Sequence, residues 1–89
     1  MLSLYEAFAS IRNEKEFGNF LRDLCTPAEM KALNERWSIA QLLSGGSMSQ
    51  KAVADRLGAS VTTVTRVARF LNDEPYKGYR LVLSRLHRA

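Results

Sequence analysis

The segment from Gln50 to Arg69 restricts the fold more than any other part of the chain, because a glycine separates two short helical patterns within it. Ala54 lies in the middle of the first pattern, where a small residue lets two helices cross closely at a steep angle. Gly58 ends that pattern, and glycine adopts the positive φ of a tight turn without steric cost. Ser60 is a suitable N-cap for the second helix. This spacing predicts a helix-turn-helix.

The second helix of the motif has one apolar face and one polar, cationic face. With about 100° between successive residues of a helix, one side carries Val64, Val67, Ala68 and Leu71. The other side carries Thr62, Thr65, Arg66 and Arg69. The side chains that we expect to point inward and hold the two helices together are Val53, Leu57, Val64 and Val67.

A polar, cationic face of this kind suits the DNA major groove. Threonine can hydrogen-bond base edges or contact a thymine methyl group, and arginine can bind guanine or phosphate. We expect the N-terminal residues of this helix to enter the groove most deeply. The residues that we expect to contact DNA are Lys51, Ser60, Val61, Thr62, Thr63, Thr65, Arg66 and Arg69. The alternative is a helical hairpin that serves packing or protein contacts without DNA binding.

Positive charge is concentrated in the half of the chain that contains the motif. Residues 1–49 carry five Lys or Arg against six acidic residues, whereas residues 50–89 carry eight against three, a net charge of +5. A basic surface on one side is typical of proteins that bind polyanions, because neutralised phosphates release condensed counterions. A solvated basic face is the other interpretation of this charge.

The rest of the chain also shows helical periodicity. Ser3 with Glu6 and Asn13 with Glu16 have the form of a capping box, and Thr26-Pro27-Ala28-Glu29 is the strongest start signal of all. Two short helices are expected to begin after Ser3 and after Asn13, and a third is expected at 27–44, ending at a left-handed cap at Gly45-Gly46. The fourth helix should run from the N-cap Ser49 to Leu57, and the fifth from Ser60 to about Leu71. The sixth should run from Pro75 to about His87, with Tyr76, Tyr79, Leu83 and Leu86 on one side. No segment alternates with period two, so we predict an all-α fold.

The length of the chain favours one small domain, residues 1–89, with a core that gains stability by pairing with a second copy. The single cysteine, Cys25, cannot form an intramolecular disulfide, which fits a reducing environment. No apolar run approaches the length of a membrane span, and no signal-peptide pattern follows Met1. We therefore expect a soluble, cytoplasmic protein with no membrane contact.

The sequence between about Leu24 and Leu71 resembles the tryptophan repressor superfamily. The matching residues are Cys25 to Leu33, Arg36, Leu42-Leu43, Met48 to Gln50, Leu57 to Ala59 and Thr63 to Arg66. The short N-terminal part, the Leu71-Asn72 ending and the stretch from Tyr79 to Arg85 are most similar to the compact YerC/YecD-type branch.

The resemblance implies a six-helix fold that forms an intertwined homodimer, with the first three helices and the last in a shared core and two helix-turn-helix units projecting from it. The implied function is sequence-specific transcriptional regulation, as a repressor. A two-fold dimer would place its two recognition helices about one DNA turn apart, on a near-palindromic operator.

The resemblance also points to a possible ligand pocket at Thr26, Arg36, Arg66, Val67 and Phe70. In the tryptophan repressor the corepressor lies between two arginines, which match Arg36 and Arg66, and Thr26 matches a ligand-contacting position. Val67 replaces a glycine that leaves space for the indole, and Phe70 replaces a serine that holds the amino group. Such overpacking costs about 1 kcal/mol or more of affinity. We therefore expect no cofactor and no dependence on tryptophan, with a tryptophan-responsive repressor as an alternative and the identity of any other effector open.

An enzyme is not expected. The only histidine, His87, lies near the end of the sequence, and Cys25 has no basic residue beside it as a catalytic partner. No cluster of metal ligands occurs either. Trp37 could substitute for an indole beside Arg36, but its place on an apolar stripe favours core packing. The remaining competitor is a helical protein-interaction module that binds a partner through the basic half.

Overall fold

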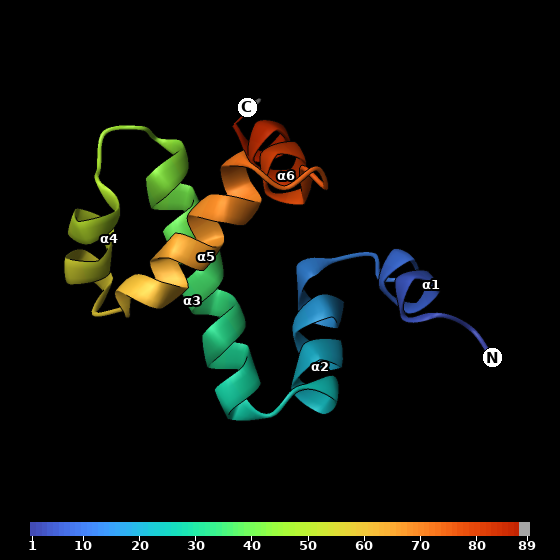
Figure 1. Ribbon diagram of the computed structural model, residues 1–89. Coiled ribbons are helices and arrows are strands. Elements are labelled where there is room, and N and C mark those ends of the chain that lie inside the picture. The colour runs from blue at the N-terminus through green and yellow to red at the C-terminus, as the bar shows by residue number, and fades with distance from the viewer. Residues whose placement is uncertain (88–89) are drawn as a thin grey trace. The chain divides into compact units, whose positions relative to one another are not determined.

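The computed structural model describes residues 1–87, which form six helices and no strand (Figure 1). The helices are α1 (Leu4–Ala9), α2 (Glu14–Leu24), α3 (Pro27–Ser44), α4 (Gln50–Leu57), α5 (Val61–Asn72) and α6 (Gly78–Leu86). The predicted all-α class is confirmed. The boundaries of α3 and the N-cap of α4 are those that the capping residues predict.

Side-chain caps start the first three helices. Ser3 Oγ accepts the Glu6 N–H at 3.1 Å, and Asn13 Oδ1 accepts the Glu16 N–H at 2.9 Å. At α3 the bonds are reciprocal, because Thr26 Oγ1 accepts the Glu29 N–H and the Thr26 N–H donates to the Glu29 carboxylate at 2.8 Å. These bonds satisfy backbone groups that have no partner within the helix.

The chain forms two compact units, Met1–Ala32 and Leu33–Ala89. In the first unit Phe8 stacks on Phe17 with ring centroids 5.5 Å apart and meets Phe20 edge to face at 5.8 Å. No residue of α1 or α2 is fully buried. The aromatic side chains of this unit therefore remain partly or largely exposed.

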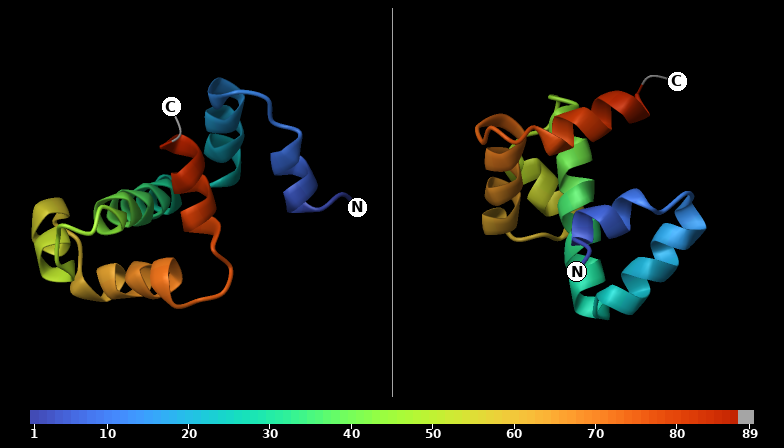
Figure 2. Two further views of the ribbon diagram at one scale, coloured as in Figure 1. Left: turned by 90° about the horizontal axis from the view of Figure 1, so that it is seen from above. Right: turned by 90° about the vertical axis from the view of Figure 1, so that its right-hand side faces the viewer.

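The second unit contains the core that holds the helix-turn-helix. Its buried cluster takes side chains from three helices, namely Ile39, Ala40, Val53, Ala54, Val64 and Val67. Figure 2 shows α4 and α5 meeting at a steep angle at the short turn between them. The small side chain of Ala54, 4% exposed, lies in the cluster, as the crossing of two helices requires.

The sixth helix begins later than its sequence predicts. It starts at Gly78, not at Pro75, because Lys77 has left-handed backbone angles, φ 58° and ψ 23°. The prediction that Tyr76 lies on this helix is therefore wrong, and Tyr76 belongs to the turn before it. Arg80 of α6 donates to the Leu71 carbonyl at 3.2 Å and so ties α6 to the C-terminal end of α5.

Candidate nucleic-acid interface

The turn between α4 and α5 has the geometry that glycine allows. Gly58 has φ 64° and ψ 29°, and the N–H groups of Gly58 and Ala59 both donate to the Ala54 carbonyl. Ser49 Oγ accepts the Ala52 N–H at the start of α4. The predicted helix-turn-helix is present, with a left-handed residue at the predicted glycine.

The inner face of α5 is buried as predicted. Val64, Val67, Ala68 and Leu71 are each less than 10% exposed, and Val53 of α4 is fully buried opposite them. Leu57 is the exception. Its side chain is 36% exposed, so the prediction that it points inward is wrong. Leu57 is the last residue of α4, where the chain turns away at Gly58.

The outer face of α5 presents the polar residues that the sequence predicts to be there. The exposed residues are Val61, Thr62, Thr65, Arg66 and Arg69, together with the cap Ser60 and, at the start of α4, Lys51. Thr63 differs from them, because it is half-buried and its hydroxyl lies 2.8 Å from that of Ser60. Ser60 Oγ also accepts the Thr63 N–H at 3.1 Å. Both hydroxyls therefore serve the start of α5.

Gln50 is a residue of this surface that sequence reasoning missed. Its Oε1 accepts a hydrogen bond from Thr65 Oγ1 at 3.1 Å, so the first residue of α4 holds a threonine on the outer face of α5. The two residues are fifteen apart in the sequence. A bond over that separation depends on the crossing of two helices and has no local sequence signal.

Arg66 and Arg69 both lie against the ring of Phe70. Their guanidinium carbons are 4.5 and 4.9 Å from its centroid. The ring of Tyr76 stacks on Phe70 with centroids 6.3 Å apart and 14° between the planes. Arg69 Nε is also 3.5 Å from a carboxylate oxygen of Glu74. The cations of α5 are therefore held by side chains of α5 and of the turn that follows it.

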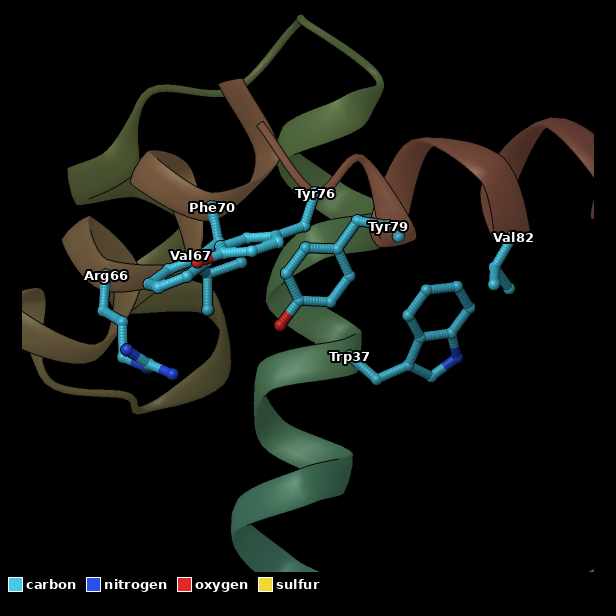
Figure 3. Close-up of a pocket in the computed structure, with 8 residues that line it drawn as sticks. Trp37, Arg66, Val67, Phe70, Tyr76, Tyr79 and Val82 are labelled. Carbon is cyan, nitrogen blue, oxygen red and sulfur yellow. The ribbon is translucent and has the colours of Figure 1, made fainter. Parts of the chain in front are cut away.

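An apolar cavity of about 520 Å³ lies beside these residues in the second unit (Figure 3). Its walls are formed by Trp37, Arg66, Val67, Phe70, Tyr76, Gly78, Tyr79 and Val82. Trp37 and Tyr79 stack with centroids 6.5 Å apart, and both pack against the buried cluster. Trp37 thus contributes to core packing, as predicted, and also lines the cavity.

The residues of the predicted ligand pocket are only partly brought together. Arg66, Val67 and Phe70 line the cavity. Val67 is 1% exposed and belongs to the buried cluster, so its bulk contributes to the core and leaves the cavity open. Arg36 is half-buried on α3 and is not among the lining residues, whereas Thr26 caps α3 in the first unit.

None of the helices in residues 1–87 has the length and apolar character needed to cross a membrane. Among the same residues, no three His, Cys, Asp or Glu side chains are grouped so that they could hold a metal ion.

Comparison with known proteins identifies the family. The family model described as Trp repressor protein matches residues 1–87. The chain belongs to the Trp repressor family. It is 35% identical over 69 residues to the uncharacterized protein YerC of Bacillus subtilis (strain 168), which supports the predicted YerC-type branch. That match covers 78% of this chain and 65% of YerC, so the chain spans less than two thirds of the relative's length.

Solved structures of this Trp repressor type have the same fold. A TrpR-like protein from Eubacterium eligens ATCC 27750 matches with a TM-score of 0.83 and 34% identity, covering 93% of this chain and 84% of its own. A candidate Trp repressor from Staphylococcus aureus matches with a TM-score of 0.83 and 29% identity, covering 93% and 81%. The predicted six-helix Trp repressor fold is confirmed.

Proposed function

We propose that this Trp repressor family member is a sequence-specific DNA-binding transcriptional repressor that inserts α5 into the major groove. The observation that carries the proposal is the division of α5 into two faces. Val64, Val67 and Leu71 are buried on one side, while Thr65 and Arg66 are exposed on the other. The major groove is about 12 Å wide and admits an α-helix whose outer face is free.

Two further features favour phosphate contacts beside the groove. The N-terminal ends of α4 and α5 present backbone N–H groups, which favour an anion such as phosphate. Lys51 lies in the first turn of α4, where its Nζ is 3.5 Å from Asp55. Both side chains of this pair are largely exposed, so the pair is weak and Lys51 can exchange to a phosphate.

We propose that the chain acts as a homodimer on a near-palindromic operator. Apolar side chains are exposed on α2, at Phe17 and Leu24, and on α6, at Leu81, Val82 and Leu86. Covering such faces with a second copy removes apolar surface from water. A two-fold dimer repeats the recognition helix about 34 to 36 Å away, one turn of DNA, which sets the spacing of the half-sites.

We propose further that DNA binding needs no tryptophan. Phe70 places its own ring 4.5 Å from the guanidinium of Arg66, so this arginine already has an aromatic partner within the protein. The cavity beside Arg66 favours the opposite case, a tryptophan-responsive repressor, because it offers an apolar space next to a cation. Calorimetric titration with tryptophan separates the two, since measurable heat of binding or a several-fold gain in operator affinity would contradict our proposal.

Selection from random DNA duplexes at low salt, followed by footprinting, tests the function directly. We expect enrichment of a near-palindromic site, with Thr65→Ala weakening its binding by about 1 to 3 kcal/mol through the loss of a base-edge contact. Arg66→Ala should weaken binding across sequences through the loss of a phosphate contact. Arg22→Ala removes the same charge from exposed α2 and is the matched control for Arg66→Ala. No enriched duplex, together with one protein recovered by affinity purification, would favour the helical protein-interaction module instead.

A further inference from the structure

The Phe70 ring, in the C-terminal half of α5, contacts the side chains of two arginines of the same helix. Phe70 lies four residues after Arg66 and directly after Arg69. Residues four apart are neighbours on a helix surface, and a long helical side chain covers the turn N-terminal to its own Cα. This explains why the Phe70 ring approaches the Arg66 guanidinium at 4.5 Å. The guanidinium of the adjacent Arg69 lies 4.9 Å from the centroid of the same ring.

The ring itself is held in place. Phe70 is half-buried and forms part of the wall of the cavity. The Tyr76 ring lies nearly parallel to it, with 14° between the planes, and Figure 3 shows the two rings one over the other. Tyr76 comes from the turn before α6, which the left-handed Lys77 separates from the helix. A ring restrained in this way can order the side chains that stack on it.

Contact with the Phe70 ring leaves the arginines able to bind DNA. A guanidinium is planar, so when its face packs against a ring its N–H donors remain in the plane, directed away from the contact. Arg66 and Arg69 are both exposed. Glu74 further restrains Arg69, because its carboxylate lies 3.5 Å from Arg69 Nε. The side chains thus lose conformational freedom before DNA is bound, and less freedom is lost on binding.

We propose that Phe70, supported by Tyr76, is a positioning residue that orients Arg66 and Arg69 for DNA phosphates. The inference rests on the proposed DNA-binding function and deepens it. Phe70 itself contacts no DNA in this proposal and acts only through the two arginines. A role in apolar packing alone would require volume at this position, whereas the proposed role requires an aromatic face.

The test compares Phe70→Leu, which keeps an apolar side chain without a π face, with Phe70→Trp, which keeps the face. The probe is a duplex of arbitrary sequence, bound over a series of salt concentrations. We expect Phe70→Leu to weaken binding about three- to tenfold, a range suggested by the strength of cation–π contacts. The slope of log affinity against log salt should become less steep by about 1, the loss of about one phosphate contact. Phe70→Trp should bind within about twofold of the wild-type protein.

A double-mutant cycle excludes a purely structural effect. In the Arg66→Ala/Arg69→Ala background, Phe70→Leu should change duplex affinity less than about 1.5-fold, because the groups that it positions are absent. Equal losses in the two backgrounds, or equal binding by Phe70→Leu and the wild-type protein, would overturn the inference and leave the proposed function intact. A wild-type protein that binds no duplex at any salt concentration would overturn both.

A measurement without DNA keeps the inference testable if Phe70→Leu folds poorly. NMR relaxation of the arginine Nε–H groups in the wild-type protein should show Arg66 and Arg69 to be more ordered than exposed Arg22 on α2. In Phe70→Trp this order should persist. Equal mobility of the three arginines in the wild-type protein would contradict the inference.

Discussion

At Gly58 the backbone conformation, and not packing, restricts which residue can be present. Its φ is +64°, in the left-handed region, and a Cβ added there would have no heavy atom within 4 Å. The space is therefore free, but an L residue in this region is strained. Gly18, inside α2, has equally open surroundings and no positive φ.

The two glycines predict opposite effects of alanine. Gly58→Ala should lower the free energy of unfolding by about 1 kcal/mol because of the left-handed backbone, and the Tm by roughly 4 to 8 °C. Gly18→Ala should raise stability by up to about 1 kcal/mol, since glycine inside a helix is unfavourable relative to alanine. Thermal unfolding followed by circular dichroism measures both. If the two variants shifted Tm in the same direction, the backbone explanation for Gly58 would be wrong.

Gln50 gives a prediction in which stability and DNA binding respond differently. Gln50→Ala removes the acceptor for Thr65, and because both groups are exposed we expect stability to change by less than about 1 kcal/mol. Duplex affinity should fall several-fold, because the Thr65 hydroxyl is no longer oriented. Gln41→Ala is the control, since the side-chain amide of Gln41 donates to the Trp37 carbonyl of its own helix. Equal duplex affinity of the Gln50→Ala and wild-type proteins would show that Gln50 does not orient Thr65 for binding.

At the scale of the element, α1 to α5 each begin at a side-chain cap, whereas α6 follows Lys77, which makes no side-chain cap hydrogen bond. The reciprocal cap at the start of α3 is local, because Thr26 and Glu29 are three residues apart. The C-terminal end of α5, in contrast, is held by Arg80 of α6, which bonds the Leu71 carbonyl and Asn72 Oδ1. A cation beside a helix C-terminus also interacts favourably with the helix dipole.

The cap of α3 makes stability depend on pH. Hydrogen bonds from the Thr26 backbone N–H, and then from its side chain, lower the pKa of Glu29 below its usual 4.5. A carboxylate whose pKa is lower in the folded state stabilises that state above its unfolded-state pKa and loses this contribution as the pH falls through the folded-state value.

The wild-type protein should therefore lose its advantage over Glu29→Gln on acidification. Glutamine keeps an acceptor at this position but does not titrate. We expect the difference in Tm to be constant at neutral pH and to shrink below about pH 4.5. Thermal unfolding at a series of pH values measures it, and the other carboxyl groups cancel in the comparison. A difference that stays constant down to pH 2 would contradict the assigned pKa shift.

At the scale of the whole molecule, the two units differ in how much they bury. The second unit holds a cluster centred on Ile39, Val53 and Val64, all fully buried. In the first unit neither α1 nor α2 has a buried residue, although three phenylalanines meet there. The proposed homodimer accounts for this difference, because a second copy would cover apolar side chains that one chain leaves exposed. The expectation of a single domain, residues 1–89, stays a prediction.

The dimer should appear in two measurements. Sedimentation equilibrium should give twice the mass of one chain, and Tm should rise with protein concentration, as it does when folding and association are coupled. Leu24→Gln, on exposed α2, should weaken association. Val61→Gln changes an apolar side chain on the proposed DNA face that is also exposed, and it should leave association unchanged. A monomer whose Tm does not depend on concentration would contradict the proposal.

The sequence alone determined the existence of the helices, the N-caps of α1 to α5, the turn at Gly58 and the two faces of α5. These features depend on residues three or four apart, whose interactions are set by the geometry of one helix. Only the tertiary structure decided which side chains meet across helices. Gln50 of α4 bonds to Thr65 of α5, and Trp37 of α3 stacks on Tyr79 of α6. The sixth helix starts only at Gly78, and Tyr76, in the turn before it, stacks on Phe70. Such contacts depend on how helices cross and where turns end, and no local periodicity specifies either.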